Sequence, residues 1–416
     1  MLRRFRTGLW ANPDFVRLWA GTTVSQFGTF IGGLALQFTA IIWLDATAAE
    51  IAILSACQLV PGFLLGPLAG VWVDRLPRRP LLIAADIGRA AGLASIPLAA
   101  LFDLLTMGHL WLAGVALSSL TVLFDTAYRA YLPALVGRTE LLEGNSKLAA
   151  SSSVAEIGGF SLSGFLVQAL TAPGAVLVDA VSFLWSALWI GRIRAPEVAA
   201  VSVDERTSVW REAVEGAGYV WRQPILRSLA GATVILNAGS RIIGVVFLLY
   251  LAEEVGFDPA VLGVIFAVGG FTSIAGAVVA HRSWFGGLGP SLIVSIVIRC
   301  LGALFMPLAK STSALSASYL VANQVVTDPA WLYYEVNETT LRQSITPDRY
   351  QGRMNATMRV LEFGAMLIGT ALGGVLGELI GLRATLWVAI AIMASAAPWL
   401  AFTAAGRIRT TPAPAE

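Results

Sequence analysis

The chain contains long apolar runs that carry no charged side chain. Such runs cover residues 18–44, 51–73, 104–124, 259–281 and 384–406. Each is longer than the roughly 20 residues that a helix needs to cross about 30 Å of hydrocarbon. Membrane-spanning strands would instead alternate apolar and polar residues over about ten positions. The pattern therefore predicts an all-α integral membrane protein.

Further apolar segments fill the rest of the chain, and Pro and Gly mark several of the loops between them. Together the segments predict twelve transmembrane helices, six in each half of the chain. We expect them near residues 15–44, 51–73, 81–102, 108–131, 147–171, 175–193, 225–252, 259–281, 289–309, 313–334, 354–378 and 384–405.

The two halves of the sequence resemble each other at a shift of 210 residues. Residues 15–24 match residues 225–234 at five positions, and the same shift pairs Gly66 with Gly276, Asn145 with Asn355 and Gly164 with Gly374. Tandem apolar halves are a common plan of secondary transporters. We therefore expect two pseudo-symmetric six-helix bundles, residues 1–194 and 223–406, with a cytoplasmic linker at 195–222 and a cytoplasmic tail at 407–416.

Charge is scarce and unevenly placed. Charged residues make up 13% of the chain, against about 25% in an average soluble protein. If the N-terminus is cytoplasmic, the outer loops hold only Lys310 and Arg383. All other loop cations then lie inside: Arg3, Arg4, Arg6, Arg75, Arg78, Arg79, Arg138, Lys147, Arg192, Arg194, Arg206, Arg211, Arg222, Arg282, Arg342, Arg349, Arg353, Arg407 and Arg409. The positive-inside rule then predicts a plasma (inner) membrane protein with both termini cytoplasmic.

The sequence gives no basis for an enzyme or a cofactor. It has no phosphate-binding Gly loop and no GxSxG motif, which argues against ATP hydrolysis and acyl transfer. Cys57, Cys300, His109 and His281 lie too far apart in sequence to predict a metal site. The net charge of +2 reflects membrane topology, so we expect no nucleic-acid partner.

A charged loop follows the second predicted helix. The end of that helix contains Gly66 and Gly70, and the segment continues with Asp74, Arg75, Arg78 and Arg79. Glycines four residues apart allow close approach of a neighbouring helix, and an acid among arginines is not explained by positive-inside charge alone. This loop resembles the signature of the major facilitator superfamily, although Pro77 stands where the pattern prefers Gly. The resemblance implies a cytoplasmic gate, for which we expect Asp125 and Arg129 on the fourth helix as partners.

Two other stretches resemble one branch of that superfamily. Residues 341–359 and 132–145 are similar to loops of the enterobactin-exporter branch, which also contains macrolide and tetracycline efflux pumps. The resemblance implies a proton-coupled exporter of a small amphipathic molecule, a drug or a siderophore, that works by alternating access. We expect it to function as a monomer whose partners are substrate, protons and membrane lipid.

The fifth helix departs from the exporter pattern. Phe160 occupies a Pro position and Ser163 a Gly position of that pattern, so the Pro-derived bend is lost. In the first helix Gly28 is followed by Thr29, where relatives often carry an acid. Proton coupling in this chain must therefore use another group. An uptake carrier of the same fold stays open as an alternative, as does a membrane scaffold or sensor that does not transport.

Ionisable residues inside a membrane span are costly, which makes each a candidate functional residue. Glu156 and Glu362 lie at intermediate depth in the fifth and eleventh helices, and we expect one of them to carry the proton. Asp86 and Arg89 are spaced to pair locally on the third helix, as are Asp125 and Arg129 on the fourth. Other candidates for the substrate cleft are Arg241, Arg299, Gln26 and Asn237.

Overall fold

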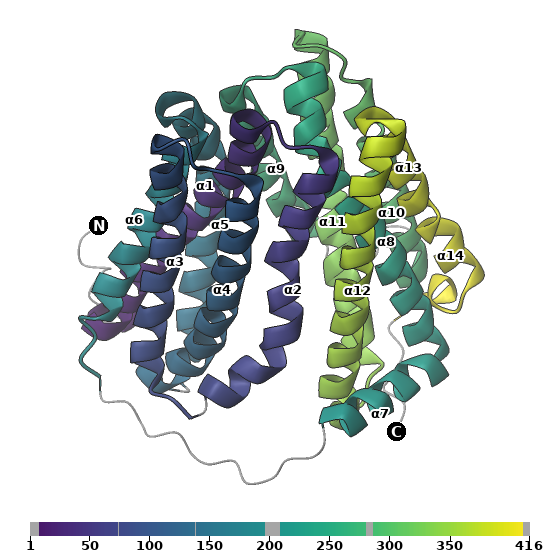
Figure 1. Cartoon of the computed structure of the whole chain (residues 1–416). Helices are drawn as coiled ribbons and strands as arrows, with labels where there is room; N and C mark the ends of the chain where they lie inside the picture. The colour runs from purple at the N-terminus through teal and green to yellow at the C-terminus, as the bar shows by residue number, and fades with distance from the viewer. Residues whose placement is uncertain (1–7, 74, 138, 196–208, 280–285, 411–416) are drawn as a thin grey trace. The chain divides into compact units, whose positions relative to one another are not determined.

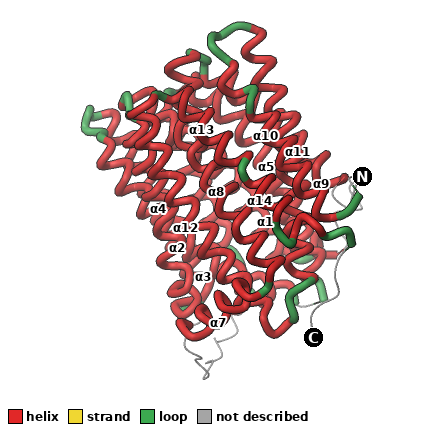
Figure 2. The backbone as a smooth tube through the Cα atoms, turned by 90° about the vertical axis from the view of Figure 1, so that its right-hand side faces the viewer, coloured by secondary structure: helices red, strands yellow, loops and turns green. Residues whose placement is uncertain are grey.

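The computed structural model describes residues 8–73, 75–137, 139–195, 209–279 and 286–410, and all regular elements within these ranges are helical. Asp74, Arg138 and residues 196–208 of the predicted linker lie outside them. The α-helices are α1 (Pro13–Phe38), α2 (Ala48–Val73), α3 (Arg78–Leu101), α4 (Met107–Val136), α5 (Leu141–Leu170), α6 (Ala172–Ile190), α7 (Val209–Arg222), α8 (Pro224–Leu249), α9 (Pro259–Val279), α10 (Leu288–Ala303), α11 (Ala314–Ser344), α12 (Asp348–Ile380), α13 (Leu382–Ala394) and α14 (Ala396–Phe402) (Figure 1). Figure 2 shows that loops join these helices at their ends.

The chain divides into two compact units. The first comprises residues 1–46, 54–203 and 258–267, and the second comprises residues 47–53, 204–257 and 268–416. In the first unit α1 packs on α5 and α6, and α3 packs on α4 and α6. In the second unit α8 packs on α12 and α13, and α10 packs on α11 and α14. The same neighbour relations therefore recur in both units, as the repeat in the sequence predicts.

The first helix of each repeat is built in the same way. Both α1 and α8 are 26 residues long, begin with Pro, and run into a π-helical segment, η3 (Thr39–Trp43) and η4 (Tyr250–Val255). Pro suits the first helical position because the N–H it lacks would have no partner there. At α1 the Asn12 side chain accepts hydrogen bonds from the N–H groups of Asp14 and Phe15, at 3.0 and 3.2 Å.

One backbone turn recurs in both halves at positions that are 210 residues apart. Thr171, before α6, has φ 71° and ψ 164°, and Gly381, before α13, has φ 82° and ψ 160°. A β-branched residue rarely adopts positive φ, whereas Gly does so readily. The two turns therefore share a positive-φ conformation, which Gly381 favours and Thr171 does not.

The outer surfaces of the helices are those of a membrane protein. Leu112 and Leu379 are each 75% exposed and Phe402 is 83% exposed. Among the described residues, eleven helical segments are long and apolar enough to span a membrane, with α13 and α14 counted as one. The twelfth expected span is α11, which is long enough but too polar to meet the same criterion. The twelve-helix all-α fold is thus confirmed.

Two predicted spans differ from the structure. The predicted span 313–334 ends too early, because α11 continues to Ser344 and carries Arg342, which was assigned to a loop. The last span is divided at Ser395, since Pro398 has no N–H to donate to the carbonyl of Ala394. The amphipathic helix α7 lies within the predicted linker. Within the part of the chain that the structure describes, a Cβ on Gly66 or Gly70 would meet no atom within 4 Å, and the role of these glycines stays a prediction.

Candidate functional site

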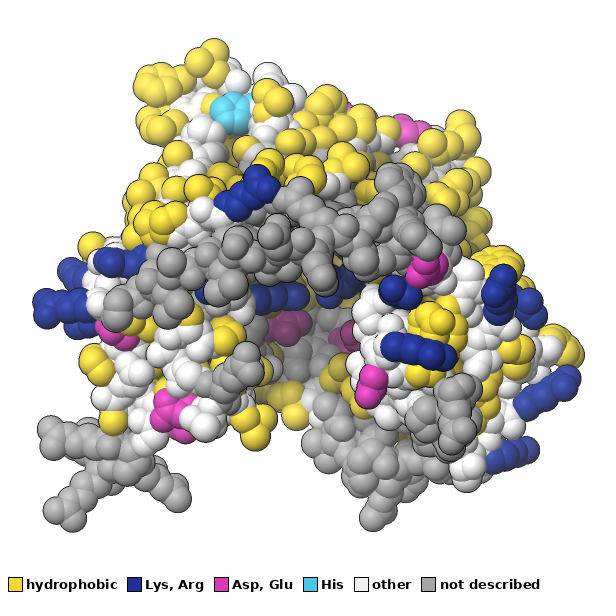
Figure 3. Space-filling view, turned by 90° about the horizontal axis from the view of Figure 1, so that it is seen from below, with side chains coloured by type: hydrophobic (Ala, Val, Ile, Leu, Met, Phe, Trp, Pro, Cys, Tyr) yellow, Lys and Arg dark blue, Asp and Glu magenta, His cyan; other side chains and the backbone are white. Residues whose placement is uncertain are grey.

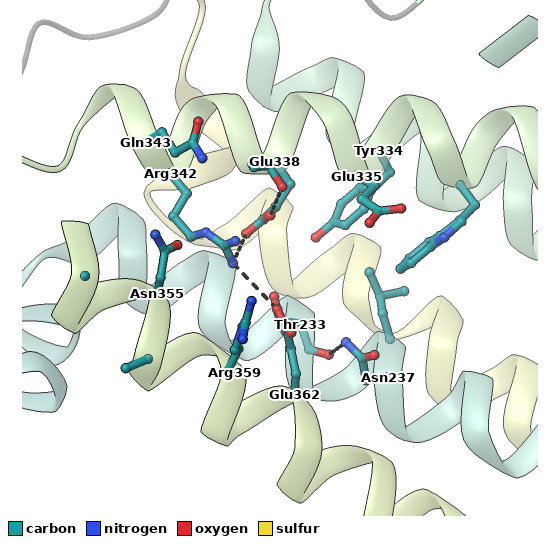
Figure 4. A pocket seen from close by; sticks show the side chains of 15 residues that line it. Thr233, Asn237, Tyr334, Glu335, Glu338, Arg342, Gln343, Asn355, Arg359 and Glu362 are labelled. Atoms are coloured by element: carbon teal, nitrogen blue, oxygen red, sulfur yellow. Dashed lines mark hydrogen bonds and ion pairs between the residues drawn. The ribbon is translucent and has the colours of Figure 1, made fainter. Parts of the chain in front are cut away.

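A polar pocket of about 690 Å³ lies within the second unit. It is formed by side chains of α8, α11 and α12 (Figure 4). The lining residues are Thr233, Leu236, Asn237, Trp331, Tyr334, Glu335, Glu338, Thr339, Arg342, Gln343, Gly352, Asn355, Ala356, Arg359 and Glu362. Three carboxylates and two guanidiniums among them give the lining a net charge of −1.

Arg342 lies between two carboxylates in this pocket. Its Nη1 is 3.6 Å from Oε1 of Glu338, one turn earlier on α11, and 3.7 Å from Oε1 of Glu362 on α12. Figure 4 marks both ion pairs with dashed lines. The Glu338 side chain is 8% exposed and the Glu362 side chain 35% exposed. One cation thus joins a buried acid to an acid that is open to the cavity.

Glu338, Arg342 and Glu362 form a charged trio whose polar atoms are not fully hydrogen-bonded. Among the described residues, neither Oε1 of Glu338 nor Nε of Arg342 has a hydrogen-bond partner, although both atoms are buried. Buried polar atoms in native proteins are nearly always paired with protein or ordered water. Glu338 and Arg342 both line the pocket, so these two unpaired atoms belong to residues at its wall.

Aromatic rings form another part of the lining. Trp331 and Tyr334 come from the same helix as Glu338, and their rings stack at 5.9 Å. Behind Trp331, the guanidinium carbon of Arg299 on α10 lies 4.1 Å from the ring centroid. Nη2 of Arg299 also donates to Oγ of Ser240, at 2.9 Å. The pocket therefore offers both flat apolar surface and charge.

The structure brings together only part of the predicted cleft. Glu362 and Asn237 line the pocket, and Arg299 supports it through Trp331. Arg241 is half-buried on α8 and does not line the pocket. Gln26 and Glu156 belong to the first unit, where Gln26 is half-buried on α1 and Glu156 is exposed on α5.

The residues of the predicted gate have separate contacts. Arg78 donates to the carbonyl of Ala130 on α4, at 3.1 Å, and Arg79 donates to the carbonyls of Ile190, at 3.1 Å, and Gly191. Arg75, Asp125 and Arg129 are exposed. Because Asp74 lies outside the described residues, the gate itself stays a prediction.

The sequence reasoning missed Glu335, Glu338, Arg342 and the two aromatic residues. The predicted tenth span, 313–334, includes Trp331 and Tyr334 but ends before Glu335, Glu338 and Arg342, because their charges resemble those of a loop. The available signal was their spacing: Trp331, Glu335, Glu338 and Arg342 recur every three or four residues, which is the period of one helix face. Glu338 and Arg342 can also pair along that face.

A second group of charges is buried in the first unit. Asp86 and Arg89 form the predicted local ion pair on α3. The Arg89 guanidinium lies between the rings of Phe124 and Phe183, 4.2 and 4.1 Å from their centroids. Asp179 on α6 is 3% exposed and was not predicted.

Helix α1 packs closely against Asp179. A Cβ on Gly32 would lie 2.4 Å from Oδ2 of Asp179, and one on Gly28 would lie 2.0 Å from Oγ of Ser182. Such distances leave no room for a side chain at either glycine. The buried charges of the first unit are therefore enclosed by aromatic rings and by backbone.

The sequence profile of the Major Facilitator Superfamily matches residues 18–334. The chain belongs to this superfamily. It is therefore a multi-pass membrane transporter, and its family is not a class of enzymes.

Relatives with similar sequences cover most of the chain. An uncharacterized MFS-type transporter, YfiS of Bacillus subtilis, is 23% identical over 88% of this chain and 87% of its own length. The multidrug efflux pump Tap of Mycolicibacterium fortuitum is 24% identical over 85% of this chain and 88% of its own length. These similarities support the superfamily, while the exporter branch within it stays a prediction.

Solved structures share the fold of this superfamily member. A bacterial homologue of the iron transporter ferroportin, in its inward-facing state, matches with a TM-score of 0.71 at 18% identity, covering 92% of this chain and 98% of its own. The nucleoside transporter NupG matches with a TM-score of 0.74 at 14% identity, covering 94% and 98%. At such identities the match concerns the fold alone.

Proposed function

We propose that this superfamily member is a proton-coupled exporter of small amphipathic molecules, and that the pocket of α8, α11 and α12 binds both substrate and proton. The proposal places the chain in the bacterial plasma membrane as a functional monomer with both termini cytoplasmic. The observation that carries it is the position of Arg342, which shares its charge between Glu338 and Glu362 at the surface of a cavity.

The lining suits an amphipathic substrate. Trp331, Tyr334 and Leu236 offer apolar surface, and Asn237 and Thr233 offer polar groups beside them. Binding pockets commonly combine apolar walls with a few well-placed polar groups. The similarity to a multidrug efflux pump supports a drug-like substrate in preference to an ion.

The trio also provides a way to couple protons to substrate. When both carboxylates are ionised, Arg342 is held between them. If Glu362, the more exposed acid, accepts a proton, it becomes a neutral carboxyl group and Arg342 keeps only Glu338 as counter-charge. The pocket then has a different net charge and a different position for the guanidinium. Substrate binding that favours one of these two states shifts their populations, which is the requirement for coupling.

Transport by the purified protein in liposomes tests this proposal. A cationic dye such as ethidium is offered outside vesicles with an acidic interior, and its uptake is followed in the fraction whose protein is inserted inside-out. Glu338→Gln and Glu362→Gln should lose accumulation driven by the pH gradient. Exchange of dye between equal concentrations, without a gradient, should continue in both variants. Accumulation that remains fully dependent on the gradient in both would contradict the assignment.

The same liposome assay distinguishes an exporter from an uptake carrier and from a scaffold or sensor that does not transport. An uptake carrier accumulates substrate in right-side-out vesicles when the exterior is acidic. A scaffold or sensor shows no flux in either orientation, although it is folded and inserted.

A further inference from the structure

A second pocket lies at one end of the first unit and plays no part in the proposed transport site. It has a volume of about 510 Å³ and is lined by Arg17 of α1, Arg79 of α3, and residues 191–194, which follow α6. Four of the six lining residues are arginines: Arg17, Arg79, Arg192 and Arg194. Figure 3 shows Lys and Arg side chains on the face of the molecule seen from below.

The backbone around this pocket is fixed by charged side chains. Asp14 pairs with Arg17 at 2.5 Å and also accepts a hydrogen bond from the N–H of Arg194, at 3.1 Å. Arg79 donates to the carbonyls of Ile190 and Gly191 at the end of α6. These contacts hold three separate elements around one cavity.

The lining of the cavity is strongly basic. Four guanidiniums line it, and the Asp14 carboxylate contacts Arg17 and the N–H of Arg194. Arg192 and Arg194 are both exposed. Positive-inside topology accounts for arginines at this end of the bundle, but it does not account for their convergence on a preformed pocket. Several guanidiniums on one cavity favour binding of an anion, and the guanidinium fork matches the geometry of phosphate.

The surroundings indicate where the phosphate comes from. The pocket lies where the apolar helices α1, α3 and α6 begin or end, which is the level of lipid headgroups. Trp189, on the last turn of α6, has the Arg192 guanidinium 5.7 Å from its ring centroid, and Trp185 is 41% exposed one turn earlier. Tryptophan is enriched at membrane interfaces, and basic pockets between transmembrane helices bind anionic headgroups.

We propose that this arginine pocket, Arg17, Arg79, Arg192 and Arg194, binds the headgroup phosphate of an anionic phospholipid. The proposal does not depend on the direction or the coupling of transport. It concerns one lipid held at a defined place, in addition to the general lipid contacts of the helices.

Native mass spectrometry of the full-length protein tests the proposal. The protein is titrated in neutral detergent with phosphatidylglycerol and, separately, with phosphatidylcholine. We expect one tight site for phosphatidylglycerol and none for phosphatidylcholine. Arg192→Gln/Arg194→Gln should weaken that site on the order of tenfold, because each basic side chain near a headgroup contributes to binding. Both side chains are exposed, so the fold should be unaffected.

A matched control is available in the second unit. Arg222→Gln/Arg227→Gln removes two exposed arginines from the end of α7 and the start of α8, where they line neither pocket, and should leave lipid binding unchanged. Arg192→Lys/Arg194→Lys keeps the charge without the planar fork and should bind with intermediate affinity. Equal loss in the test and control variants would overturn the proposal, and so would equal binding of both lipids. Displacement of the lipid by millimolar inorganic phosphate would overturn the lipid as the source of the phosphate.

Discussion

Two acid–arginine pairs of similar sequence spacing lie in the two units and differ in their surroundings. On α3, Asp86 and Arg89 are 0% and 4% exposed, and two aromatic rings enclose the guanidinium. On α11, Glu338 and Arg342 are also largely buried, but they line a cavity and Arg342 reaches a second acid. A charge inside a membrane helix is therefore not sufficient evidence of a transport site. Access from a cavity distinguishes the pair on α11.

The largest expected effect tests whether the pair on α3 is structural. Arg89→Gln leaves Asp86 and Asp179 buried without their cation, and breaking a buried pair typically costs about 3–5 kcal/mol. We expect a much lower melting temperature in detergent and a lower folded yield. Arg342→Gln should cost clearly less, because one of its two acids, Glu362, is open to the cavity and water there can solvate it.

The double variant Asp86→Asn/Arg89→Gln should recover part of the loss, since it removes both charges. Equal destabilisation by Arg89→Gln and Arg342→Gln would show that access from a cavity does not distinguish the pair on α11 from the pair on α3.

A smaller loss of stability is expected when a glycine that packs against a neighbouring helix is replaced by alanine. Gly32→Ala places a methyl group against the carboxylate of Asp179 and should destabilise the protein by about 1–3 kcal/mol, as overpacking does. Gly70→Ala is the matched control, because among the described residues no atom lies within 4 Å of the position of its Cβ. Thermal melts of both variants check this, and an unchanged melting temperature for Gly32→Ala would mean that α1 can move away from α6.

The smallest expected effect concerns Glu156, the other acid that the sequence predicted as a proton carrier. Glu156 is exposed on α5 and does not line the pocket. Glu156→Gln should therefore change transport by no more than about twofold, as for most surface substitutions. The liposome assay checks this beside Glu362→Gln. Loss of gradient-driven transport in Glu156→Gln alone would move the proton site to the first unit.

The fold could be predicted from the sequence because membrane spans are long and the repeat constrains their order. The turn at Thr171 and Gly381 shows why the repeat is a better guide than local preference. Thr171 alone would not predict positive φ, but its equivalent in the second half is Gly. The end of α11 could not be predicted in the same way, since charged residues inside a helix and in a loop give the same hydropathy.

The candidate site was predicted only in part. Glu362 and Asn237 were found because each interrupts an apolar stretch. Arg342 was missed because its burial depends on two partners, one on its own helix and one on α12. Asp179 is a different case, since a single acid within the apolar segment of α6 could have been noticed. Which buried charges line a cavity depends on packing, and the hydropathy pattern does not contain that information.

The polarity of α11 has a consequence for how the protein enters the membrane. Helices are released into the bilayer one by one when they are apolar enough, and α11 falls below the criterion that eleven other segments meet. Its principal neighbour is α10, which precedes it by a short loop and is strongly apolar. We expect the two to insert together as a helical hairpin. Glycosylation mapping of chains that end after α11, with and without α10, would show whether α11 can insert alone. The polar residues of α11 that line the pocket would then also make insertion of α11 depend on α10 during synthesis.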